Sequence, residues 1–235
     1  MVAMAGGVVA VVVDAVDAEG LARFWAAALE WPAGPGAVVR PPGGGVELRF
    51  AGGAGAKGGK NRLHLDLAGG GRQEATVRRL LGLGAVRADI GQGDVPWEVL
   101  ADPEGNELCV LPEHRGAPGA ALAQICLDAA DAEAQGRFWS AATGWAVTGR
   151  GEWGVCLRDP AGAGPALVMG PPAAPKSGRN RLRLRLAAAP PGHAGALADP
   201  EGNEFEVGGW CCDREGLPGA CGVRCGASQG AGSAS

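Results

Sequence analysis

The side chains best suited to chemistry lie on short segments in which apolar and polar residues alternate. Residues 61–67 read Asn-Arg-Leu-His-Leu-Asp-Leu, which places the leucines on one face of a strand and His64 with Asp66 on the other. An imidazole beside a carboxylate can act as a general base or as a metal ligand. The alternative is a polar face that lines a cleft without chemistry.

Acidic and thiol side chains show the same alternating spacing further along the chain. Glu107 and Cys109 are two positions apart, so they share a face if this segment is a strand, as do Glu204 and Glu206. The simpler alternative for both pairs is ordinary polarity on an accessible strand face.

The first glutamate of each pair, Glu107 or Glu204, is the last residue of an internal repeat. Residues 102–107 read Asp-Pro-Glu-Gly-Asn-Glu and recur unchanged at residues 199–204. Chance identity of this length is negligible in a chain of 235 residues, so the protein contains two copies of one unit. Within the hexapeptide, proline presets φ and glycine supplies a positive φ, which predicts a turn between two strands of a hairpin.

The elements that must position these residues follow in order through the first copy. Residues 8–13 form an apolar, valine-rich run typical of a buried strand. Apolar residues at helical spacing over 21–29 predict a helix that ends before Trp31-Pro32. The remaining predicted elements are strands near 38–39 and 46–50, the strand of His64, a helix over 72–83, and the hairpin at 95–111.

The second copy repeats this order until a deletion interrupts it. Strands are predicted at 124–127, 155–157, 166–169 and 180–186, and a helix at 132–143 whose Arg-Phe-Trp matches the first helix. Leu67 and Asp102 are 35 residues apart, but Leu186 and Asp199 are only 13 apart. The second copy therefore lacks the second helix and the strand after it. The predicted domains are residues 1–115, residues 120–209, and a disordered Gly/Ala/Ser/Cys tail at 210–235.

The deletion leaves an apolar strand face without its helix. Leu182, Leu184 and Leu186 share one face, and leaving them in water would cost about 1.5–3 kcal/mol for each side chain. We expect the first domain, a second chain or the tail to cover them, and we expect the second copy to be unstable alone.

Composition excludes several classes of protein. The net charge of −4 does not suggest a nucleic-acid partner. The sequence has no run of about 18 apolar residues, so no transmembrane helix is predicted. The apolar start lacks a basic segment, which favours a strand over a signal peptide and places the protein in the cytoplasm, with its seven cysteines reduced.

Together these motifs resemble the vicinal oxygen chelate superfamily and, within it, the glyoxalase-like domain proteins. The resemblance is carried in order by the first strand, the Arg-Phe-Trp helix, the segment Lys60 to Leu67, and the twice-written hexapeptide. It implies an α+β fold of tandem βαβββ modules forming cup-shaped mixed sheets, with the second domain truncated. Enzymes of this superfamily hold a divalent metal ion in the cup, with side chains from the first, fourth, fifth and eighth strands.

The metal-ligand positions implied by the resemblance are only partly filled. They fall at Ala10, Phe50 or Ala51, His64 and Cys109 in the first copy, and at Gln124, about Gly170, Arg183 and Glu206 in the second. Neither set offers three or four N and O ligands, and the charge of Arg183 would repel a cation. The resemblance therefore implies a degenerate site, with one divalent ion (Zn, Ni, Fe or Mn) at His64 or none bound tightly.

The predicted function is binding of a small organic molecule in the cup of the first domain. The alternatives are a divalent-metal-dependent lyase or isomerase of the glyoxalase type and a non-catalytic module for drug sequestration or dimerisation. Partners beyond the small molecule are a second copy in a homodimer, or the other domain of the same chain. The candidate catalytic residues are His64 and Glu107, and the candidate ligand-binding residues are His64, Asp66, Trp97, Cys109, Gln124, Arg183 and Glu206.

Overall fold

A computed structural model of the chain describes residues 7–69, 72–112, 121–162, 164–190 and 197–208. The predicted tail and its four cysteines lie outside these ranges. Within them, every helix is too short or too polar to cross a membrane.

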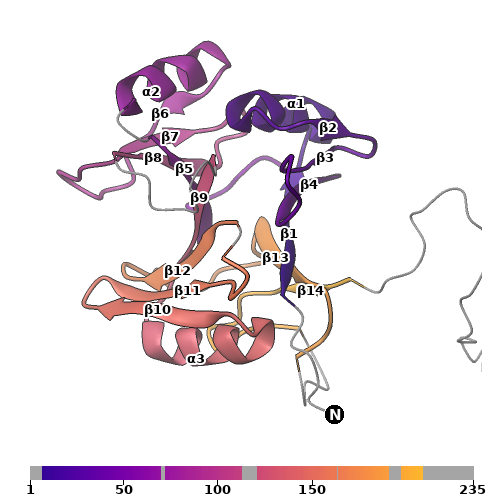
Figure 1. Cartoon of the computed structure of the whole chain (residues 1–235). Coiled ribbons are helices and arrows are strands. Elements are labelled where there is room, and N and C mark those ends of the chain that lie inside the picture. Colours follow the sequence, from indigo (N-terminus) through magenta and orange to yellow (C-terminus); the bar gives the residue numbers. More distant parts are fainter. Residues whose placement is uncertain (1–6, 70–71, 113–120, 163, 191–196, 209–235) are drawn as a thin grey trace, which may run out of the picture.

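The first copy consists of two modules, each built from one helix and four strands (Figure 1). The first module comprises β1 (Val8–Ala15), α1 (Ala18–Leu29), β2 (Ala33–Gly34), β3 (Val38–Val39) and β4 (Glu47–Gly52). The second module comprises β5 (Leu63–Ala68), α2 (Gln73–Gly82), β6 (Val86–Arg87), β7 (Glu98–Ala101) and β8 (Glu107–Leu111). Asp17 begins α1 because its side chain accepts a hydrogen bond from the Gly20 amide, and Glu30 ends it in the left-handed region.

The second copy repeats one module in full and a second in reduced form. The third module comprises β9 (Leu122–Asp128), α3 (Ala132–Thr143), β10 (Ala146–Gly151), β11 (Gly154–Arg158) and β12 (Ala166–Gly170). The fourth comprises β13 (Leu182–Leu186) and β14 (Glu206–Val207), and the described residues between them contain no helix.

The two copies exchange partners, so that each sheet combines one module from each copy. A six-stranded sheet has the order β14-β13-β1-β4-β3-β2, and an eight-stranded sheet has the order β10-β11-β12-β9-β5-β8-β7-β6. β1 pairs antiparallel with β13, and β5 pairs antiparallel with β9. The cup predicted within the first domain is therefore formed between the two domains of one chain, because backbone hydrogen bonds join the leading strands of different copies.

The leucines left uncovered by the deletion are buried against the first copy. Leu184 lies opposite Val11 and Leu182 opposite Val13 in the β1–β13 ladder, and all three leucines belong to the main core. Phe205 extends this packing, since its ring lies 5.5 Å from the Trp139 ring on α3. β1 of the first domain is therefore the in-sheet neighbour of β13, and β5 of the first domain contacts β13 from the other sheet.

The repeated hexapeptide joins the modules through hydrogen bonds and ion pairs. In the first copy the Glu104 carboxylate accepts hydrogen bonds from the amides of Val16 and Asp17 and forms an ion pair with Arg181 of the other copy. Glu201 does the same in the second copy, with the amides of Ala130 and Asp131 and with Arg62. The acids of the hexapeptide therefore hold structure, and each copy locks onto an arginine of the other.

Candidate functional site

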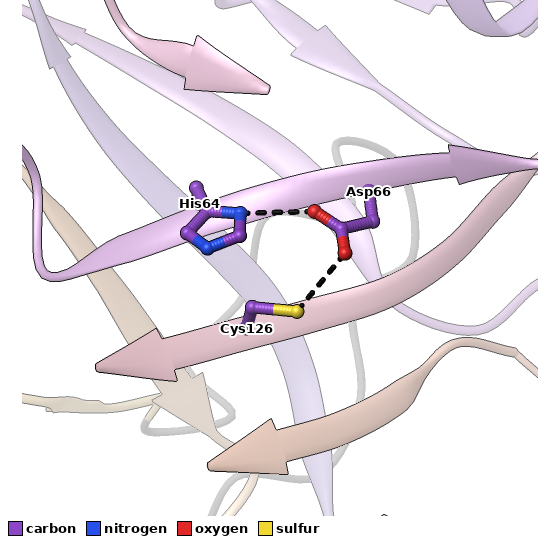
Figure 2. A group of neighbouring side chains, drawn as sticks. All are labelled: His64, Asp66 and Cys126. Carbon is purple, nitrogen blue, oxygen red and sulfur yellow. Dashed lines mark hydrogen bonds and ion pairs between the residues drawn. The ribbon is translucent and has the colours of Figure 1, made fainter. Parts of the chain in front are cut away.

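The polar face of the eight-stranded sheet bounds a cavity of about 610 Å³. Three side chains converge there from neighbouring strands, His64 and Asp66 from β5 and Cys126 from β9 (Figure 2). His64 Nδ1 lies 2.9 Å from Asp66 Oδ1, and Cys126 Sγ lies 3.1 Å from Asp66 Oδ2. One buried carboxylate therefore binds two different donors.

Strand alternation and register bring these residues together. On β5 the side chains of Leu63, Leu65 and Leu67 enter the core, so those of His64 and Asp66 face the cavity. In the ladders His64 lies opposite Cys126, while Asp66 lies between Gln124 on β9 and Cys109 on β8. Residues opposite one another on one face have neighbouring Cβ atoms, which explains the cluster.

The Asp66 carboxylate sets the proton positions on His64. Burial disfavours the imidazolium, but Coulomb attraction and the hydrogen bond to Asp66 outweigh burial, and the pKa of His64 is raised above its ordinary 6.5. An ionised carboxylate only accepts hydrogen bonds, so Nδ1 carries the proton. In the neutral ring this leaves Nε2 as the atom able to take a proton or bind a metal ion.

The neighbouring thiols are held in their protonated form. Burial, reinforced by the charge of Asp66, raises the pKa of both Cys109 and Cys126 far above the ordinary thiol value. Nucleophilic catalysis needs a thiolate, which is favoured by positive neighbours. In the absence of a cation these cysteines are therefore poor nucleophiles.

Two tryptophans provide aromatic surface in the same cavity. Trp97 donates a hydrogen bond from Nε1 to Gln92 Oε1 over 2.8 Å, and Trp153 remains 53% exposed, which places it at the opening. The Trp153 ring lies against β10, where Gly149 and Gly151 leave room for it. A residue other than glycine at position 151 would clash with this ring, because its Cβ would lie 2.6 Å from Trp153 Nε1.

The structure brings together five of the predicted site residues: His64, Asp66, Trp97, Cys109 and Gln124 all line the cavity. Glu107 is not among its lining residues, because it pairs with Lys57 Nζ at 2.6 Å and accepts from the Asn61 amide. A role for Glu107 as a catalytic partner of His64 therefore has no geometric support.

Arg183 and Glu206 belong to the other sheet. Arg183 forms ion pairs from Nη1 to Asp14 Oδ2 at 2.7 Å and from Nη2 to Glu206 Oε1 at 2.9 Å. Its side chain is buried, with an exposed fraction of 3%. Neither Arg183 nor Glu206 lines the cavity that contains His64. Arg183, a candidate ligand-binding residue, forms an internal ion triad with Asp14 and Glu206.

Sequence analysis missed Cys126 and Cys156, which also line the cavity. The available signal for Cys126 was its position two residues after Gln124 on one strand, which puts both on one face. Its contact with Asp66 depends on the pairing of β5 with β9, which the order of elements within one copy does not reveal.

Comparison with known protein families agrees with this architecture. The sequence model of the "Glyoxalase-like domain" family matches residues 10–111 and 124–193, more than half of the chain. The chain belongs to the glyoxalase-like domain family. The two matched segments coincide with the two copies, so this glyoxalase-like protein is a tandem of the family's unit.

Solved structures show the same fold at low sequence identity. A V278E mutant of glyoxalase I from Zea mays has a TM-score of 0.55 at 12% identity, covering 86% of this chain and 91% of that one. A putative dioxygenase from Bacillus subtilis subsp. subtilis strain 168 has a TM-score of 0.51 at 15% identity, covering 79% and 71%. No curated protein sequence matches the chain.

Because each sheet combines strands of both copies, the cavity contains expected metal-ligand positions from both copies. The cavity of the glyoxalase-like protein contains His64 and Cys109 from the first copy with Gln124 and Gly170 from the second. A different cluster in the same place suits a metal ion better, since donor atoms of His64, Asp66 and Cys126 all lie within 4.8 Å of one another. Imidazole, carboxylate and thiolate are all ligands of zinc-class ions.

Proposed function

We propose that the glyoxalase-like protein binds a small organic molecule in the cavity between its two copies. The observation that carries the proposal is one cavity of about 610 Å³ that combines a buried His64–Asp66–Cys126 cluster with the tryptophans Trp97 and Trp153. Ligand sites have volumes of about 300–1,000 Å³, with apolar walls and a few convergent polar groups. The proposal moves the site predicted in the first domain to the junction of both.

The arrangement of the cavity suggests how a ligand would lie. The exposed face of Trp153 suits a flat or apolar body, because aromatic rings stack on one another and bury large apolar areas. His64 Nε2 and the Gln124 amide are suited to an oxygen-bearing end of the molecule.

A thermal-shift screen of small hydroxylated and carbonyl compounds tests this proposal, since a ligand that prefers the folded state raises its stability. We expect at least one compound class to raise the Tm of the wild type. His64→Gln and Trp153→Leu should reduce the shift, while the surface variant Glu98→Gln should not. If the Tm shift is the same in His64→Gln and Trp153→Leu as in the wild type, the ligand binds elsewhere. If no compound class raises the Tm of the wild type, the proposal is contradicted.

A second candidate is a divalent-metal-dependent lyase or isomerase of the glyoxalase type. The observation that favours it is the His64, Asp66 and Cys126 cluster, whose side chains would hold the ion. A bound divalent ion polarises substrate oxygens as a Lewis acid. In this candidate function Asp66 would orient the imidazole, and His64 would bind the ion through Nε2.

Metal analysis distinguishes this candidate. If the protein is such an enzyme, the purified wild type should contain about one equivalent of Zn, Ni, Fe or Mn, and the His64→Ala variant should contain none. Less than about a tenth of an equivalent in both proteins would contradict it.

A third candidate is a non-catalytic module for drug sequestration or dimerisation. The expected metal-ligand positions in the cavity favour it, because Gly170 offers no side-chain ligand and Gln124 offers only an amide. Recovery of a bound compound chemically unchanged after long incubation would support sequestration. A concentration-dependent change in sedimentation would support dimerisation. The cytoplasmic location remains a prediction from the sequence.

A further inference from the structure

The side of the six-stranded sheet that faces away from the core carries a group of arginines. Core-facing side chains of this sheet, such as Val11, Leu48 and Leu184, belong to the main core, so their strand neighbours lie on the opposite face. We call this opposite surface the arginine face. The ladders place these side chains on it: Glu47 and Arg49 of β4, Ala10, Val12 and Asp14 of β1, Arg183 and Arg185 of β13, and Glu206 of β14.

The repeat shows that the arginine face differs in charge from the equivalent face of the other sheet. Residues 180–186 correspond to residues 61–67, so Arg183 replaces His64 and Arg185 replaces Asp66. Guanidinium groups keep their positive charge and only donate hydrogen bonds, whereas a carboxylate only accepts them. The two sheets are therefore suited to ligands of different charge.

On the β4 side of the arginine face, two guanidinium groups share one carboxylate. Arg40 Nε lies 2.9 Å from Glu47 Oε2, and Arg49 Nε forms an ion pair with Glu47 Oε1. The Arg49 side chain retains an exposed fraction of 32%. One positive charge is therefore in excess here, and solvent can reach it.

On the β13 side, Arg185 is a cation without an acidic partner. Arg183 forms ion pairs with both Asp14 and Glu206. In the part of the chain that the structure describes, Arg185 forms no ion pair, although Glu206 lies opposite it in the ladder. Arg185 is partly buried, and burial of an unpaired charge is unfavourable, so an anion from solution would stabilise it.

The two unbalanced arginines flank β1 from opposite sides. Arg49 of β4 lies opposite Val12, and Arg185 of β13 lies opposite Ala10. Neighbouring strands are about 4.8 Å apart, so the backbones of β4 and β13 are separated by about 10 Å. Ala10 and Val12 are buried, so an incoming anion would meet guanidinium groups rather than the apolar strand between them. A small anion above β1 can therefore receive hydrogen bonds from both sides.

We propose that the arginine face binds a small oxyanion with two or more negative charges, a polycarboxylate or a phosphate, through Arg49 and Arg185. A guanidinium group binds carboxylate and phosphate oxygens through two parallel hydrogen bonds. This site is separate from the cavity of the proposed function, because neither arginine lines that cavity. The chain then binds ligands of different chemistry on its two sheets.

Calorimetric titration of the full chain with citrate and, separately, with inorganic phosphate tests the proposal at physiological ionic strength. We expect one anion to bind per chain, and the probe that binds more tightly identifies the anion class. Arg49→Gln and Arg185→Gln should each weaken this binding about tenfold, because each loses charge-assisted hydrogen bonds. Arg150→Gln is the matched control and should leave binding unchanged, since Arg150 is an exposed, ion-paired arginine of the eight-stranded sheet.

A fourth variant should strengthen anion binding, which loss of folding cannot imitate. Glu206→Gln removes a carboxylate that competes for Arg183, so the positive charge in excess grows and binding should tighten about threefold. Absence of binding by both probes, unchanged binding to Arg49→Gln or Arg185→Gln, or weaker binding to Glu206→Gln would each overturn the proposal. His64→Gln should not affect anion binding, so this site and the cavity of the proposed function are tested separately.

Discussion

Asp66 accepts one hydrogen bond from His64 on its own strand and another from Cys126 on β9. The same carboxylate therefore favours the imidazolium of His64 and keeps the thiol of Cys126 protonated. A sequence can predict the His64–Asp66 pair, because strand alternation places both on one face. It cannot predict the thiol, because that contact needs the register between two copies.

The raised pKa of His64 gives a prediction with a definite sign. In the metal-free protein the stabilisation from the His64–Asp66 pair is fully present below the unfolded pKa of 6.5 and is lost as pH rises through the higher folded pKa. Asp66→Asn removes the attraction and leaves burial, so the pKa of His64 should fall below its wild-type value. NMR titration of the His64 ring measures both values, and an equal or higher pKa in Asp66→Asn would contradict the assignment.

At the scale of elements, the hexapeptide is a fastening between modules. The sequence predicted a turn and a hairpin, and β7 and β8 form that hairpin, with Gly105 at φ 82° as the turn requires. The predicted helices and most strands are also observed. The role of Glu104 and Glu201 was not predictable, because each acid meets an arginine that lies 77 or 139 residues away in the chain.

Glu104→Gln and Glu201→Gln should each destabilise the protein by about 1.5–3 kcal/mol, because hydrogen bonds to a charged group are lost in a mostly buried setting. Denaturant unfolding measures this free energy. Glu98→Gln is the matched control, since its pair with Arg87 is exposed and such pairs contribute about 0–1 kcal/mol. Equal effects of all three substitutions would refute the role of the hexapeptide as a fastening.

At the scale of the whole molecule, the deletion and the exchange of strands belong together. Leu182, Leu184 and Leu186 are buried in the main core, with β1 of the first domain beside β13 and β5 in contact with it, so the first domain is the one of the three expected covers that the structure favours. The fold family was predictable because local motifs carry it. The sequence could not predict which modules share a sheet. Pairing within a copy and pairing between copies would both place the same apolar strand faces in the core.

A fragment of residues 120–209 should therefore fail to fold alone. β13 would lose its β1 partner, and three leucines would lose about 1.5–3 kcal/mol of burial each. Far-UV circular dichroism and NMR of the fragment test this. A dispersed NMR spectrum with cooperative melting would show that the second copy is self-sufficient.

The most direct test of the cavity between the copies is calorimetric titration of the strongest screening compound against Val168→Trp. Val168 lines the cavity from β12 of the second copy and is only partly buried, so a larger side chain can fill the cavity without entering the core. We predict one bound molecule per wild-type chain, no measurable binding to Val168→Trp, and unchanged binding to the exposed control Val86→Phe. Wild-type affinity in a folded Val168→Trp protein would contradict a binding site between the copies.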